Sequence, residues 1–277
     1  MQAQAKITPN TTVQRVAPFL ALAFGLTWGL AALFLLFPEP FLALFGEISM
    51  NNPALILAVY SPGIAGIFLV WRWFGVRGLG RFLRRLALGR APGAWWLFVI
   101  LGIPAVFYAG AAVKGTANAP FPFTPWVQVF PALALALFLG PIEEFGWRGV
   151  ALPLLQRRFS PLWAGLILGI CWGVWHVPAF MLSGTAQSAW SFAPFFAGIV
   201  AISVMMTPLF NAARGSLLLP VLFHFQMNNP IWPDAQPWDT LFFVGAAVVI
   251  VWLNRATLFQ RGSGVTDILM AAPGGGR

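Results

Sequence analysis

Charged residues are scarce in this chain of 277 residues: they make up 8% of the sequence, and only seven of them are acidic. Soluble domains carry roughly 25% charged residues. The mean hydropathy of +0.80 points the same way. The uncharged runs are long enough to cross a bilayer as helices, which argues against the short alternating strands of a membrane barrel. The composition therefore predicts an all-α integral membrane protein in contact with the lipid bilayer.

Cysteine is almost absent as well. The single cysteine, Cys171, excludes an intramolecular disulfide and gives no indication of the compartment. The net charge of +9 would suit nucleic acid, but we expect no such partner, because the basic residues follow a membrane topology. A cleavable signal is not expected either. Lys6 and Arg15 precede an uncharged run of 22 residues, which is too long for a signal peptide and is typical of a first membrane helix.

The apolar runs predict about eight membrane helices, at residues 16–37, 53–71, 94–113, 125–155, 161–182, 189–210, 216–229 and 239–254. With this count, fourteen of the sixteen Lys and Arg residues fall on one side, Lys114 lies on the other and Arg148 lies within the membrane. The positive-inside rule then places both termini in the cytoplasm. Six arginines between residues 72 and 90 predict a short helix on the membrane surface.

The domain organisation is expected to be simple, since the sequence shows no internal repeat. We predict a polar N-terminal tail at residues 1–14, a single membrane domain at 15–256 and a disordered C-terminal tail at 257–277. Within the fourth predicted helix, prolines at 131, 141 and 153 are expected to kink or interrupt the helix, because proline lacks the N–H that an α-helix needs.

Three charged residues stand inside this same apolar run. They are Glu143, Glu144 and Arg148. A charge at the centre of a bilayer costs at least ~2.5–3.5 kcal/mol, so such residues indicate a function or a tight pairing. Glu144 and Arg148 are four residues apart and can pair on one helix face. Glu143 points about 100° away from Glu144, which leaves this carboxylate free for chemistry.

The only two histidines of the chain, His176 and His224, also lie in apolar helices. Asn228 follows His224 by four residues and shares its helix face. At a rise of 1.5 Å per residue, Glu143, His176, His224 and Asn228 lie roughly 15–22 Å above the cytoplasmic ends of their helices. One histidine alone could simply bond a backbone carbonyl, and the Glu144–Arg148 pair could be a structural clasp. The common depth of the whole set favours a single shared cavity with a function.

These residues form three ordered motifs: Glu143-Glu144-x-x-x-Arg148, then Trp172-x-x-x-His176, then His224-x-x-x-Asn228. The pattern resembles the CPBP family of membrane proteases, which includes CAAX prenyl proteases, abortive-infection-like proteins and bacteriocin-processing enzymes. The resemblance covers about residues 125–230. Trp172 stands where the family usually has Phe, and we expect this aromatic exchange only to repack the pocket.

The chemistry that these residues allow is peptide hydrolysis. Glu143 can act as the general base and His176 can hold the same water, while His224 and Asn228 can stabilise the oxyanion. Glu144 and Arg148 would hold Glu143 in place. The resemblance implies the same roles. We therefore predict an intramembrane endopeptidase that cleaves near the C-terminus of a membrane-associated, prenylated or peptide substrate.

The need for a metal is left open by the sequence. Glu143, His176 and His224 would form a Glu/His/His set that is known from catalytic zinc sites, yet no HExxH motif is present. A glutamate-activated water without a metal is the alternative.

Other classes of protein also place polar residues in the membrane. A transporter or channel would do so, but it usually shows repeated halves, which are absent here. A non-catalytic immunity or scaffold protein is the third alternative, although it would not need a base and oxyanion donors together.

Overall fold

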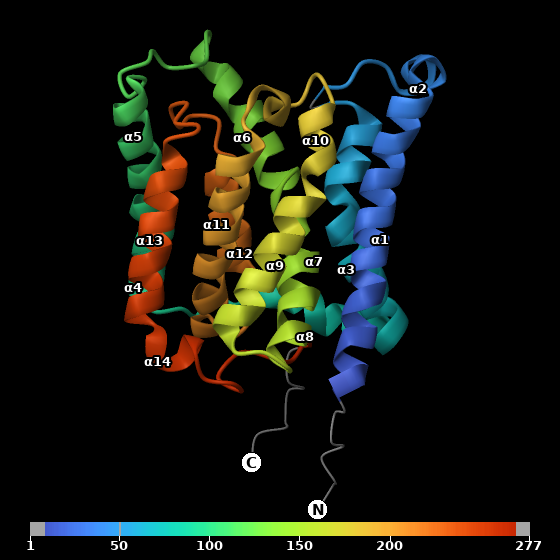
Figure 1. Ribbon diagram of the computed structural model, residues 1–277, viewed down its shortest axis with the longest axis vertical. Helices are drawn as coiled ribbons and strands as arrows, with labels where there is room; N and C mark the ends of the chain where they lie inside the picture. Colours follow the sequence, from blue (N-terminus) through green and yellow to red (C-terminus); the bar gives the residue numbers. More distant parts are fainter. Residues whose placement is uncertain (1–8, 50, 270–277) are drawn as a thin grey trace, which may run out of the picture.

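The computed structural model describes residues 9–49 and 51–269, and within these ranges all regular elements are helical (Figure 1). In this described part of the chain, six helical segments are long and apolar enough to cross a membrane, namely Val16–Leu36, Pro53–Ala87, Gly93–Lys114, Trp126–Gln156, Pro161–Met181 and Phe192–Ala212. Two shorter apolar helices, Leu218–Met227 and Asp239–Leu253, complete the bundle. The all-helical membrane fold is confirmed, whereas the count of eight membrane spans stays a prediction.

The first helices pack closely because small residues line their contacts. α1 (Pro9–Leu36) is followed by the short α2 (Pro38–Phe45) and lies against α3 (Pro53–Leu83). Glycines on α3 let the segment with the two glutamates come very near. A Cβ at Gly66 would lie 2.8 Å from the Cα of Gly146, so only glycine allows this approach.

The arginine-rich segment is helical, as predicted, but it is not confined to the surface. The chain turns at Gly75, whose φ of 66° favours glycine, and continues to the 3₁₀ turn Arg84–Ala87. Arg85 in this turn is buried. Its guanidinium donates to the carbonyl oxygens of Gly215 at 2.6 Å, Gly149 at 3.2 Å and Ile268 at 2.7 Å. The buried arginine thus ties three distant backbone segments together.

The fourth predicted helix is interrupted, as its prolines led us to expect. In order along the chain, its pieces are η3 (Trp126–Gln128), α6 (Val129–Phe138), η4 (Pro141–Glu143), α7 (Glu144–Gly146), the π-turn η5 (Trp147–Ala151) and α8 (Leu152–Gln156). Pro141 begins η4, where it removes a helical hydrogen-bond donor. The two glutamates therefore lie at a break in the backbone, and π-turns of this kind are frequent at functional sites.

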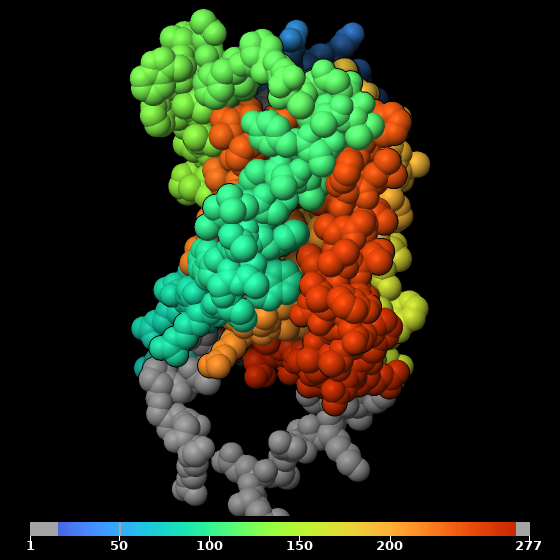
Figure 2. Space-filling model, turned by 90° about the vertical axis from the view of Figure 1, so that its left-hand side faces the viewer, coloured from blue at the N-terminus to red at the C-terminus, as the bar shows by residue number. Residues whose placement is uncertain are grey.

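The remaining helices surround this break (Figure 1). They are α4 (Gly93–Leu97), the π-turn η2 (Phe98–Gly102), α5 (Ile103–Lys114), α9 (Pro161–Trp175), α10 (Val177–Met181), η6 (Ala186–Ala189), α11 (Phe192–Ala212), α12 (Leu218–Met227), α13 (Asp239–Leu253) and α14 (Arg255–Leu258). Figure 2 shows α5 and α13 side by side on one face, where the rings of Phe107 and Phe243 are 5.7 Å apart. The outward side chains of α13, such as Val248 and Trp252, are exposed, as expected for a lipid-facing helix.

The C-terminal segment corrects one expectation. Residues 257–277 were predicted to be disordered, but the chain is packed against the bundle as far as residue 269. Ile268 is buried, the side chain of Gln156 donates to the Val265 carbonyl at 2.8 Å, and that of Arg157 donates to the Thr266 carbonyl at 3.0 Å. The glycine-rich composition misled the prediction because one apolar anchor and several backbone hydrogen bonds hold this segment. Residues 270–277 lie outside the described part, as do residues 1–8 of the predicted N-terminal tail; α1 already begins at Pro9.

The predicted topology can be tested with single cysteines. In a Cys171→Ser background, Arg84→Cys and Ala189→Cys place thiols in exposed positions near opposite ends of the bundle. The arginine-rich end should face the cytoplasm. A membrane-impermeant maleimide should therefore label Ala189→Cys in intact cells and Arg84→Cys only after permeabilisation. Labelling of Arg84→Cys in intact cells would reverse the orientation.

Candidate active site

Glu143 is held by two tryptophans. It ends η4 and is 4% exposed. Its Oε2 accepts a hydrogen bond from the indole N–H of Trp172 at 2.8 Å and a second from that of Trp147 at 3.3 Å. Both donors use the same oxygen. Oε1 has no hydrogen bond from any described residue and is left for the cavity that Glu143 lines.

Glu144 has a different surrounding. Its Oε1 lies 3.0 Å from Nη1 of Arg148, and both side chains are fully buried, so the predicted pair is present. The same oxygen lies 2.7 Å from Nδ1 of His224, on α12. No spacing pattern signals this second contact, because the two residues are 80 positions apart. Glu144 therefore joins the broken helix to α12 and orients the His224 ring.

Trp172 contributes more than repacking. Its ring lies under the guanidinium of Arg148, with 4.4 Å from Cζ to the ring centroid, in addition to the hydrogen bond to Glu143. A phenylalanine could keep the contact with Arg148 but has no N–H to donate. The expectation that the aromatic exchange only repacks the pocket missed this bond.

His176 lies at the joint between α9 and α10. Its backbone N–H bonds to Gly173 at 3.2 Å, and its Nδ1 lies 2.8 Å from the carbonyl oxygen of Trp172. A carbonyl can only accept, so Nδ1 carries the proton and Nε2 of the neutral ring is an acceptor. His176 thus makes the bond to a backbone carbonyl that would be expected of a histidine with a purely structural role. It also orients the ring toward the shared cavity.

His224 and Asn228 meet at Gly140. A Cβ on Gly140 would lie 2.9 Å from Nε2 of His224 and would collide with Nδ2 of Asn228. Asn228 follows the last residue of α12 and caps that helix, which leaves its side chain clear of the helix body. Since Nδ1 of His224 faces Glu144, its Nε2 edge and the Asn228 amide lie around the same point. The glycine at this position is therefore part of the site.

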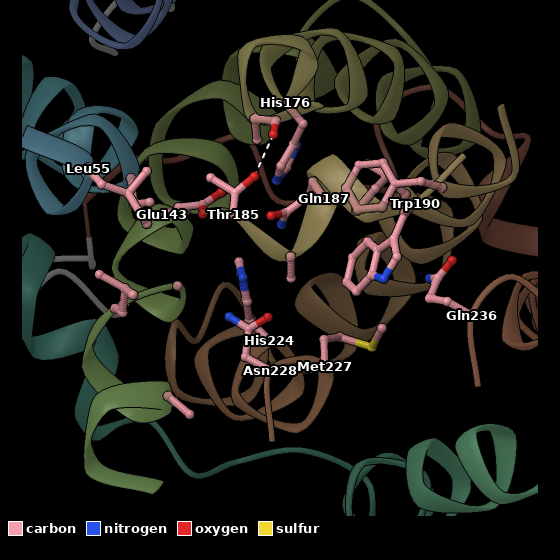
Figure 3. Close-up of a pocket in the computed structure, with 18 of the residues that line it drawn as sticks. Leu55, Glu143, His176, Thr185, Gln187, Trp190, His224, Met227, Asn228 and Gln236 are labelled. Atoms are coloured by element: carbon pink, nitrogen blue, oxygen red, sulfur yellow. Dashed lines mark hydrogen bonds between the residues drawn. The ribbon is translucent and has the colours of Figure 1, made fainter. Parts of the chain in front are cut away.

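One cavity of about 670 Å³ brings these groups together. Glu143, His176, His224 and Asn228 all line it, as the sequence predicted, and Figure 3 shows the two histidine rings and Asn228 pointing toward the same space. Most of the remaining wall is apolar. The sequence analysis missed Gly140 and Trp147, because glycine and tryptophan are too frequent in this chain to mark a site on their own. It included Trp172 as a motif residue but did not foresee that its indole N–H donates to Glu143.

The zinc alternative finds no support in the arrangement of side chains. Within residues 9–49 and 51–269, no three His, Cys, Asp or Glu side chains lie close enough together to hold a metal ion. We therefore derive no reaction step through a metal.

Comparison with known proteins now bears on this geometry. Residues 125–229, which contain every motif residue of the site, match the family model described as Type II CAAX prenyl endopeptidase Rce1-like. This segment is similar to that family. The match confirms the resemblance to CPBP membrane proteases that the three motifs of this Rce1-like segment indicated. A curated protein of Methanococcus maripaludis, named CAAX prenyl protease 2, is 30% identical over 172 residues, which is 57% of this chain. The chain spans only 62% of that relative's length.

The buried pair in the Rce1-like segment leads to a stability prediction. Arg148→Ala leaves the Glu144 carboxylate without its cation and should lower the free energy of unfolding by about 3–5 kcal/mol. The double variant Arg148→Ala/Glu144→Gln should recover part of this loss, as measured by membrane yield and thermal unfolding in detergent. Lys114→Ala removes the more accessible ion pair with Asp234 and serves as the control, with a loss of at most about 1 kcal/mol. If the double variant is no more stable than the single one, the pairing does not explain the role of Arg148.

Gly140 gives a prediction for activity. Gly140→Ala should displace Asn228 and the Nε2 edge of His224. If these groups stabilise an oxyanion, as we expect from the sequence, kcat should fall by about 10²–10³-fold, the usual effect of losing one oxyanion donor. Gly29→Ala, in α1, is the matched control, because a Cβ there meets nothing within 4 Å. We expect the control to keep its kcat and both variants to keep their thermal stability. If Gly140→Ala keeps the parental kcat, the glycine has no role in the reaction.

Proposed function

We propose that the protein is an intramembrane endopeptidase that hydrolyses a peptide bond near the C-terminus of a membrane-associated, prenylated or peptide substrate. One observation carries the proposal. A buried carboxylate with one free oxygen, a histidine with a free acceptor nitrogen and two further polar groups all face the same largely apolar cavity. The Rce1-like segment that contains them supports the assignment.

The first half of the reaction uses Glu143 and His176. Oε1 of Glu143 takes a proton from a water molecule, and Nε2 of His176 accepts a hydrogen bond from the same water and orients it. The water oxygen then attacks the carbonyl carbon of the scissile peptide. A C–O bond forms, and the carbonyl oxygen takes up the negative charge.

The second half uses Asn228, His224 and again Glu143. The Asn228 amide donates to the oxyanion, and the Nε2 edge of His224, whose Nδ1 contacts Glu144, faces the same charge and stabilises it. Glu143 returns its proton to the peptide nitrogen, the C–N bond breaks as the oxyanion collapses to a carbonyl, and a carboxylic acid and an amine leave. The base is regenerated without any further reactant.

The substrate class follows from the cavity wall. Trp190, Met227, Trp232 and Phe243 make much of the wall apolar, which suits an isoprenoid chain or apolar side chains near the scissile bond. The name of the Methanococcus relative, a CAAX prenyl protease, favours the prenylated form among these candidates.

The decisive experiment compares variants on prenylated and unmodified C-terminal peptides. Glu143→Ala and His176→Ala should each lower kcat by at least about 10³-fold without reducing membrane yield, since each removes a group that acts on the attacking water. Glu47→Ala, an exposed glutamate in a loop, is the control and should keep full activity. Peptidase activity should also withstand prolonged chelation. Retained activity in Glu143→Ala would refute the proposal and raise the transporter and scaffold alternatives.

A further inference from the structure

Trp172 contacts each of the polar groups that surround it in a different way. Its indole N–H donates to Glu143 Oε2 at 2.8 Å, and its backbone carbonyl accepts from Nδ1 of His176 at 2.8 Å. Its ring stacks under Arg148, and the ring centroid lies 5.5 Å from that of His224. The carbonyl would be present with any residue at this position. Only the indole N–H depends on tryptophan.

The bond from this indole matters because both of its partners are buried. Trp172 is 2% exposed and Glu143 is 4% exposed. A buried carboxylate oxygen without a donor is costly, and hydrogen bonds to charged groups are among the stronger ones. The second donor, Trp147, lies at 3.3 Å, so its bond is longer and weaker. Trp172 is therefore the main group that decides which oxygen of Glu143 turns away from the cavity.

We propose that Trp172 is a positioning residue for the catalytic carboxylate: its indole N–H fixes Oε2 of Glu143 and thereby presents Oε1 to the attacking water. Trp147, four residues after Glu143, assists from the other side. This inference rests on the proposed function, because it presumes that Glu143 is the base. It adds a role for an aromatic residue whose ring alone would only fill space.

A general base is effective only when its oxygen lies within hydrogen-bond reach of the water, and small displacements of a catalytic group lower the rate steeply. Without the indole N–H, the carboxylate group of Glu143 should be free to rotate, so that neither oxygen is held toward the water. The substrate still binds in the unchanged cavity. The defect should consequently appear in kcat and not in KM.

The kinetic test uses Trp172→Phe, which keeps an aromatic ring near Arg148 but has no donor. We expect kcat to fall about tenfold or more with KM within about twofold of the parental value. Trp147→Phe should show a smaller loss of a few-fold, and the double variant should lose more than the product of the two, because the carboxylate then has no indole donor. Trp28→Phe is the matched control: its indole donates to the Trp175 carbonyl at 3.3 Å, Trp28 does not line the cavity, and kcat should stay near parental.

A spectroscopic test does not depend on activity. In protein labelled with ¹⁵N on tryptophan, the Trp172 indole resonance can be assigned by its loss in Trp172→Phe. It should lie downfield, as expected for a donor to a carboxylate, and should move upfield in Glu143→Ala, which leaves Trp172 itself unchanged. The Trp175 resonance should move little in the same variant.

The outcomes separate this inference from the proposed function. An inactive Glu143→Ala together with a fully active Trp172→Phe would overturn the role of Trp172 and leave the endopeptidase standing. An active Glu143→Ala would overturn both. An indole resonance that does not respond to Glu143→Ala would also overturn the positioning role, even if Trp172→Phe proved too unstable to assay.

Discussion

The site depends on one buried ionic contact, in which Glu144 Oε1 meets both Arg148 and His224. Removing a carboxylate and a guanidinium from water costs several kcal/mol per ion, and the contact regains this only if each charge keeps its partners. The three side chains belong to two segments that are far apart in the sequence. Their contact therefore fixes the position of α12 against the broken helix, and with it the direction in which His224 faces.

This contact requires an irregular backbone within the bundle. In a regular helix from residue 125 to 155, the direction of every side chain would be set by one straight helix axis. The break at Gly140 and Pro141 and the π-turn at Trp147–Ala151 change that course. In a membrane, such backbone is tolerated where protein buries it or where it lines a cavity. Here α3 packs against the break through its glycines on one side, and the cavity lies on the other.

The sequence predicted the fold class and the polar members of the site, for a clear physical reason. A charge or a histidine in an apolar run has few explanations, so Glu143, Glu144, Arg148, His176 and His224 stand out singly. Spacing on one helix also predicted the Glu144–Arg148 pair. Spacing says nothing about contacts between helices, however, and so the bond from Glu144 to His224 was missed.

Other parts of the structure could not be foreseen because their residue types are common here. The chain has fourteen tryptophans and 28 glycines, and no pattern separates Trp147 or Gly140 from the rest or shows that the indole of the motif residue Trp172 is a hydrogen-bond donor to Glu143. Arg85 looked like one more arginine of a surface segment. Its burial depends on three carbonyls that come from Gly149, Gly215 and Ile268, and the last of these lies in a tail that composition marked as disordered. Long-range hydrogen bonds of this kind leave no periodic signal.

The two ends of the bundle differ in a way that bears on the substrate. At the arginine-rich end, two side chains hold the C-terminal segment. Arg85 donates to the carbonyl of Ile268, and Gln156 donates to the carbonyl of Val265. At the other end, the residues that line the cavity include the exposed Ala186 and Asp234. If the cavity opens only at this end, a chain terminus enters it more readily than an internal loop, because a loop must enter and leave through the same opening. Such an opening would suit the proposed cleavage near the C-terminus of a substrate, where only a short length of chain lies beyond the scissile bond.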